Sequence, residues 1–268
     1  MRIFRLIPAL SPILFLFLSL CLNAQVDNEV YGTVSYKTYN NLGRRVTSDM
    51  ILKFNRKESY YLEILDNEKA LNEEVSEEVK NMFAIDKSNK LQNLFVHYNL
   101  ETSKIVYNKR AFKTYQILEE MERFDWQTTN EEKEIGNYVC RKAVGKFRGR
   151  NYEAWFAMEI NVPFGPWKAN NLGGLILELS EENDLFRVVA TRITLSSTDN
   201  GIEDDINNNP HKNKAAVSIE EYGKIKRQEW EENLSVVKSR LPKGVFMSGD
   251  HYNTTDHLEY FKELDEWH

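Results

Sequence analysis

The residues that could hold a metal ion gather near the C-terminus. His251 and His257 stand beside Asp250 and Asp256, and imidazole with carboxylate is a common zinc ligand set. A separation of six residues between the two histidines, however, fits neither one face of a helix nor the usual zinc spacings. We therefore expect solvated tail residues here and no metal site.

Other reactive or ligating residues also lack the pattern that a site needs. The acidic run ending in Asp205 has neither the glycine nor the ligand spacing of an EF-hand calcium loop. Cys140 has no histidine near it and lies in an alternating stretch, where cysteine usually packs as a small core residue. No nucleophile elbow or phosphate-binding glycine loop stands out. We predict no catalytic residue, cofactor or metal ligand, although a site of scattered carboxylates would leave no pattern among 41 acidic residues.

A cluster of positive charge interrupts a chain whose formal net charge is −6. Five cations fall within ten residues, namely Arg141, Lys142, Lys146, Arg148 and Arg150. Such a cluster could bind phosphate head groups or the acidic surface of a partner protein. The alternative is a charged hairpin tip that protects the sheet against edge pairing. The acidic balance of the whole chain disfavours nucleic acid as a partner.

The N-terminus predicts export. A positively charged start precedes an apolar run over 13–20, and Ala24 supplies a small residue at a cleavage position. This is the pattern of a secretory signal peptide over residues 1–24, too short for a membrane span. Cys21 raises the alternative of a lipoprotein, but Leu20 stands where lipid attachment usually requires a small residue. We expect a protein of the periplasm or outer-membrane surface, with Cys140 as its one remaining cysteine and no transmembrane segment.

Short β-type runs at roughly ten-residue spacing predict the elements that must position any site. They favour an antiparallel sheet over alternating strands and helices. The expected strands cover 31–39, 50–54, 59–65, 91–98, 103–107, 111–118, 137–147, 152–159, 175–179 and 186–195. We predict a mainly β fold with some α, in which a curved, half-open barrel-like sheet surrounds a helix or an apolar cleft.

Two helices are expected among these strands. Apolar residues every three or four positions among glutamates predict a short helical insert near 70–83. A longer helix, 219–240, begins at a capping box on Ser218. The polar segment 199–214 is expected to be a long loop, and the absence of repeats or linkers favours one domain over 25–268.

The stretch from 165 to 177 predicts a corner between two strands. Proline cannot donate to a sheet ladder, so Gly165 and Pro166 end one strand. Trp167 would then fold over the end of the sheet, with core packing favoured over the alternative that it lines a cleft with Trp155 and Trp126. The corner ends at Leu172, Gly173, Gly174, Leu175 and Ile176. The two glycines would permit a positive φ or a close approach of two backbone segments, and the apolar residues would return the chain to the core.

The run AWFAMEINVPFGPWKANNLGGLILEL, residues 154–179, resembles the signature of the GLPGLI family of exported proteins common in Bacteroidetes. Four of the six name-giving residues match, while Asn171 replaces a glycine and Gly173 replaces a proline. Segments at 124–126, 138–143 and 147–150 also resemble that family. The resemblance implies an exported protein of the bacterial envelope and supplies no activity and no catalytic residues.

Three classes of function therefore remain open. The first is a non-enzymatic binding module that holds an apolar or amphipathic ligand in the concave sheet. The second is an interaction or accessory protein for outer-membrane transport machinery, which would use the basic hairpin and the polar loop. The third is an enzyme whose site combines scattered carboxylates. A dry apolar cleft would favour the first class, an exposed aromatic and basic surface the second, and convergent carboxylates the third.

Overall fold

A computed structural model describes residues 30–41, 45–64, 94–110, 113–209 and 214–241. The expected signal peptide with Cys21, the helical insert near 70–83 and the C-terminal histidines lie outside the described residues. The described part contains twelve strands and two helices. They are β1 (Tyr31–Asn40), β2 (Val46–Phe54), β3 (Glu58–Ile64), β4 (Phe95–Asn99), β5 (Lys104–Arg110), β6 (Thr114–Glu120), β7 (Asp125–Ile135), β8 (Tyr138–Phe147), β9 (Arg150–Ala157), β10 (Leu175–Glu181), β11 (Phe186–Ser196), α4 (Ile202–Asn207), β12 (Ala216–Val217) and α5 (Ile219–Arg240).

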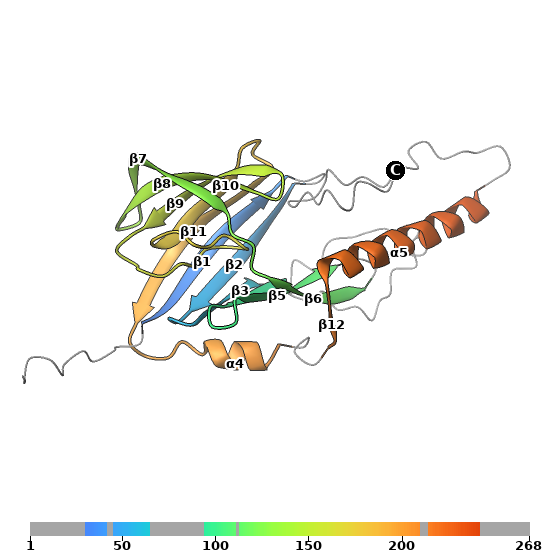
Figure 1. Ribbon diagram of the computed structural model, residues 1–268, viewed down its shortest axis with the longest axis horizontal. Coiled ribbons are helices and arrows are strands. Elements are labelled where there is room, and N and C mark those ends of the chain that lie inside the picture. The colour runs from blue at the N-terminus through green and yellow to red at the C-terminus, as the bar shows by residue number, and fades with distance from the viewer. Residues whose placement is uncertain (1–29, 42–44, 65–93, 111–112, 210–213, 242–268) are drawn as a thin grey trace, which may run out of the picture.

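The described strands form one curved sheet (Figure 1). Its order is β12-β6-β5-β4-β3-β2-β1-β11-β10-β9-β8-β7, so two up-and-down meanders meet where β1 pairs with β11. All pairings are antiparallel except the short one between β12 and β6. Because β12 and β7 remain at opposite ends of this order, the sheet is open. The expected fold class, a curved antiparallel sheet that does not close, is confirmed.

Alternating burial explains how the sheet forms its core. Along β1, Val34, Tyr36 and Thr38 are buried while the residues between them are partly exposed. This alternation is typical of a strand with one face packed inward. The main core cluster combines side chains from both meanders, including Leu52 and Leu179. The two halves of the curved sheet are therefore held together by one shared apolar interior.

The strand β7 was missed by the sequence prediction. It spans Asp125–Ile135, carries the acidic residues Glu131, Glu132 and Glu134, and is mostly exposed. Charged side chains are tolerated there because β7 is an edge strand, with only β8 beside it among the described strands. A register shift between Thr128 and Glu132 further distorts this edge.

Helix α5 is confirmed with its expected start. The Ser218 hydroxyl accepts a hydrogen bond from the Glu221 backbone N–H at 3.1 Å, which is an N-cap. Only its first turns reach the sheet, where Ile219 and Tyr222 pack with Ile117 of β6. The rest of the helix runs away from the sheet in Figure 1. The sheet therefore does not curve around α5. No helix in the described part of the chain is both long and apolar enough to cross a membrane.

The prediction of an unstructured loop over 199–214 was wrong in its first half. Helix α4 forms there, and its fully buried Ile202 packs against Tyr60 and Phe95 on strands β3 and β4. Gly201 stands before it with φ 72°, a left-handed conformation that glycine adopts without strain. One apolar anchor in a polar sequence was too weak a signal to predict a helix.

Candidate functional site

The corner between β9 and β10 lies inside the curved sheet and brings Trp167 into its aromatic core. The indole ring has Phe186, Phe147 and Tyr152 at centroid distances of 5.6, 5.7 and 5.9 Å. Phe124 follows at 6.3 Å and stacks in turn on Trp126 at 4.7 Å. Trp167 thus packs among aromatic side chains at the end of β8 and the start of β11, and the residue as a whole is half-buried.

The left-handed residues of the corner are not the glycines that the sequence analysis expected. Left-handed backbone occurs at Trp167, with φ 55°, and at Asn171, with φ 65°, and not at Gly173 or Gly174. Gly174 is required by close approach, because a Cβ there would lie 2.2 Å from the backbone oxygen of Ala157. Gly173 has open space around it. Asparagine tolerates the left-handed region better than most residues, which explains its place at 171.

The remaining residues of the predicted corner separate into two groups. Leu172, Leu175 and Ile176 are buried in the main core, and a Cβ at Gly165 would clash with Ile176. Trp155 points to the opposite face of β9 from Tyr152, since neighbours along a strand alternate. There the Lys133 ammonium lies 4.2 Å from the Trp155 ring, and the indole N–H donates to Glu153. Trp155 and Trp167 therefore do not line one cleft.

The five cations of the basic cluster do not form one exposed patch. Arg148 and Gly149, with φ 44° and 76°, make the predicted hairpin tip between β8 and β9. The side chain of Arg148 is nevertheless only 9% exposed, and that of Arg150 is 13% exposed and paired with Glu181. Both arginines at the hairpin tip therefore pair with carboxylates of the same chain.

Lys142 pairs with Glu153 and Glu131 on the outer face, and Arg141 pairs with Glu132 at 3.6 Å. Lys146 is the exposed member of the cluster. The charges of this region therefore serve mainly to bind strands of the same sheet to one another.

A buried charge network, which the sequence did not reveal, fixes the corner to the far meander. Lys168 is 2% exposed and its ammonium lies 2.7 Å from Glu119 on β6. Arg148 reaches the same carboxylate at 3.0 Å and Glu122 at 2.7 Å. The Lys168 ammonium also lies 3.8 Å from the ring centre of Tyr107 on β5. These contacts hold the hairpin tip and the corner across the open side of the sheet.

A pocket of ≈ 370 Å³ lies beside this network, on the inner side of the sheet. It is placed there because several wall residues belong to the main core or pack against it. Its apolar and aromatic wall includes Met50, Tyr61, Val96, Tyr107, Trp167 and Phe186. Val46 and Leu94, which are 48% and 46% exposed, stand where the pocket meets solvent. Strands β1 to β5 and the corner all contribute to it, so no single sequence motif could have indicated it.

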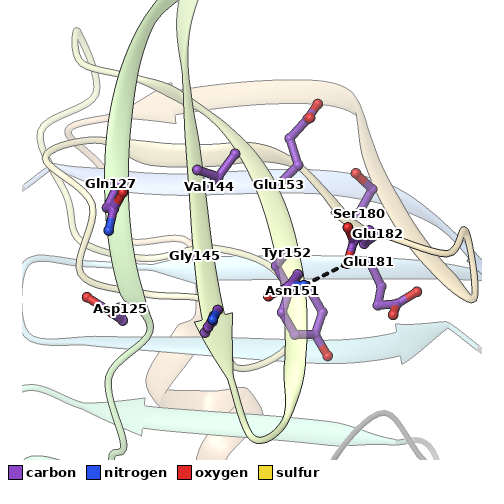
Figure 2. Close-up of a pocket in the computed structure, with 11 residues that line it drawn as sticks. Asp125, Gln127, Val144, Gly145, Asn151, Tyr152, Glu153, Ser180, Glu181 and Glu182 are labelled. Carbon is purple, nitrogen blue, oxygen red and sulfur yellow. Dashed lines mark hydrogen bonds between the residues drawn. The ribbon is translucent and has the colours of Figure 1, made fainter.

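A second hollow, of ≈ 570 Å³, lies over strands β7 to β10 and is polar (Figure 2). The strand register aligns its side chains in two rows. One row is Gln127, Val144, Glu153 and Ser180, and the other is Asp125, Lys146, Asn151 and Glu182. The Asn151 amide donates to Glu182 at 2.6 Å, as the dashed line in Figure 2 shows. Hydroxyl, amide and carboxylate groups here can bind polar or cationic groups.

The pKa shifts of Glu153 and Cys140 do not suit these two side chains to proton transfer or nucleophilic attack. Partial burial raises the pKa of Glu153, but hydrogen bonds from Lys142 and Trp155 outweigh it, so the pKa lies below the usual value. A carboxylate held ionised in this way is not suited to act as a general acid. Burial raises the pKa of the Cys140 thiol to about 11, which keeps it protonated and unreactive at neutral pH. Among the described residues, no group of three or more histidine, cysteine or acidic side chains could hold a metal ion.

No model of a protein family and no curated protein matches the sequence. Among solved structures, PNGF-II in two crystal forms aligns with 75% of this chain at a TM-score of 0.49 and 17% or 16% identity. The chain spans about a third of PNGF-II, at 33% and 34% of its length. An uncharacterized conserved protein from Thermus thermophilus aligns over 70% of this chain and 90% of its own, with a TM-score of 0.36 and 8% identity.

A putative outer membrane lipoprotein-sorting protein domain from Vibrio parahaemolyticus is also similar. It covers 69% of this chain and 92% of its own, with a TM-score of 0.26 and 9% identity. At TM-scores below 0.5 and identities below 25%, these likenesses say nothing about what this chain binds. Function has to be argued from the two hollows themselves.

Proposed function

We propose that this protein is a non-enzymatic binding module of the bacterial envelope, which holds an apolar or amphipathic ligand in the inner pocket. The observation that carries the proposal is the pocket itself, a concave space of ≈ 370 Å³ walled mainly by aromatic and aliphatic side chains. Small-molecule sites are typically of this size and character. Burial of apolar ligand surface against such a wall contributes about 25 cal/mol per Å².

The sequence supports the cellular setting of this proposal. The N-terminal pattern predicts export to the periplasm or outer-membrane surface, where lipids and other apolar molecules require carriers. We propose membership of the GLPGLI family on the resemblance of residues 154–179. The left-handed backbone at Asn171 supports that alignment, since the family signature has glycine at this position.

The accessory role for outer-membrane transport machinery is not favoured by a particular observation. It would use the basic hairpin as an exposed surface, and the buried pairings of Arg148 and Arg150 leave little of that surface. The hollow over β7 to β10 gathers the carboxylates of Asp125, Glu153 and Glu182, and the pKa of Glu153 lies below its usual value. The inner pocket remains the better basis for function.

Binding of the neutral apolar dye N-phenyl-1-naphthylamine tests the proposal. Its fluorescence should rise on addition of protein and saturate at one dye per chain. Val46→Trp, at the pocket mouth, should weaken dye binding at least tenfold. The matched control is Val139→Trp on β8, because Val139 is 47% exposed and lines neither hollow. Equal dye binding by both variants and the wild type would reject the inner pocket as the site.

A further inference from the structure

Several of the charged and polar side chains in the wall of the inner pocket are engaged with other protein groups. The Ser48 hydroxyl donates to Glu63 at 3.0 Å, and the Leu94 backbone N–H donates to the same carboxylate at 3.3 Å. Thr38 and Tyr61 share a hydrogen bond of 3.1 Å between their hydroxyls. The Glu63 carboxylate in the wall therefore accepts hydrogen bonds from neutral groups of the protein.

Lys168 is the positive charge of the wall whose partner is clear. It is paired with Glu119, and the Arg148 guanidinium shares that carboxylate. Taking a charged group from water into a space walled mainly by apolar side chains is costly. A charged ligand group is therefore more stable outside the mouth, in water.

The size of the pocket limits what can enter it. Its ≈ 370 Å³ accommodates about a dozen groups of the volume of a water molecule, roughly 30 Å³ each, and a methylene group is of similar size. The volume suits one hydrocarbon chain of roughly a dozen carbons better than a pair of long chains. Val46 and Leu94 give the mouth an apolar rim past which such a chain can slide.

We infer that the inner pocket binds the hydrocarbon tail of a single-chain amphiphile and does not discriminate the charge of its head group. This inference rests on the proposed binding function and names the ligand class for the same site. The volume of the pocket sets the tail length beyond which affinity no longer rises. Head-group charge has little effect on affinity, because the head group stays in water beside the apolar rim of Val46 and Leu94.

The experiment measures displacement of N-phenyl-1-naphthylamine by alkyl chains of 8, 10, 12, 14 and 16 carbons, each below its micelle concentration. Every length carries a maltoside, a carboxylate or a trimethylammonium head, and titrations are made at 50 and 500 mM NaCl. Affinity should rise about fourfold per added methylene up to about twelve carbons and then level off. At equal length the three heads should differ less than about threefold at either salt concentration. Val46→Trp should weaken all three heads by one common factor, and Val139→Trp should weaken none.

Contrary results separate the inference from the proposed function. An affinity more than tenfold higher for one head group, lost at 500 mM NaCl, would overturn the inference. It would show that the pocket discriminates head groups by their charge. Displacement independent of chain length would overturn it as well. If the dye binds but no chain displaces it, the pocket accepts flat aromatic ligands and the inference fails alone. If neither dye nor chains bind, both the proposed function and the inference are rejected.

Discussion

Removal of the Trp167 ring is the most informative single perturbation of the corner. The ring has four aromatic neighbours, with centroids at 5.6 to 6.3 Å. Deleting a buried tryptophan typically costs about 3–5 kcal/mol, and the partial exposure of this one favours the lower end, about 3 kcal/mol. For a chain of this size we expect Trp167→Ala to lower the melting temperature by about 6–12 °C.

The backbone at this position supplies an internal test. With φ 55°, any residue except glycine is strained there by about 1–2 kcal/mol. Trp167→Gly should therefore be no less stable than Trp167→Ala, although glycine in place of alanine usually costs about 0.5–1 kcal/mol. A result in which Trp167→Gly is clearly the less stable variant would show that the left-handed backbone is not strained.

Urea unfolding followed by far-ultraviolet circular dichroism is the appropriate assay, because fluorescence would change with the loss of the tryptophan itself. Trp230→Ala is the matched control, since Trp230 is also half-buried but belongs to none of the hydrophobic clusters of the described residues. Its cost should stay within about 1 kcal/mol. A wild-type midpoint for Trp167→Ala would refute the packing argument. If Trp167→Ala also lost dye binding, the main role of Trp167 would be to contact the ligand and not to stabilise the core.

Three further predictions concern the corner, the network and the thiol. Gly174→Ala should prevent folding or cost several kcal/mol by clash with the backbone of β9, whereas Gly173→Ala, with open space around it, should change the urea midpoint little. Arg148→Ala should cost about 2–3 kcal/mol of unfolding free energy, mainly through its buried partner Glu119, since its other partner Glu122 is exposed. The exposed Lys146→Ala should cost less than about 0.5 kcal/mol, and equal costs would refute the internal role. Burial raises the pKa of Cys140 to about 11, so stability present at lower pH should be lost as pH rises through that value, and Cys140→Ala should remove this loss. Rapid reaction of the native thiol with a disulfide reagent at pH 8 would contradict its burial.

Local sequence patterns predicted the strands and helices that are determined by residues close together in sequence. The alternation in 152–159 indicated a strand, which the structure places at Arg150–Ala157, and the capping box at Ser218 located the start of α5 to the residue. Strand β7 and helix α4 were missed because charged residues dominate both segments. Their stability comes from neighbours distant in sequence: β8 pairs with β7, and the aromatic pair Tyr60 and Phe95 receives Ile202.

The candidate site could not be predicted because its parts meet only in the folded sheet. Glu119 precedes its partner Arg148 by 29 positions and Lys168 by 49, and no periodicity connects them. The pocket draws its wall from strands in both meanders and from the corner, so each wall residue looks like an ordinary core residue in sequence. The corner itself was visible, because glycine, proline and tryptophan have strong and specific backbone and packing requirements.

The pairing of β1 with β11 has a consequence for how the chain reaches its fold. The Thr191 hydroxyl bonds to the Ser35 carbonyl across 156 positions, and this pairing joins the two meanders. Closing so large a loop is entropically costly, and folds dominated by distant contacts form slowly. During synthesis, β1 lacks its β11 partner until residue 186 has emerged, and an unpaired edge is a site for association with other chains. Refolding from urea should therefore be slow, with a yield that falls as protein concentration rises.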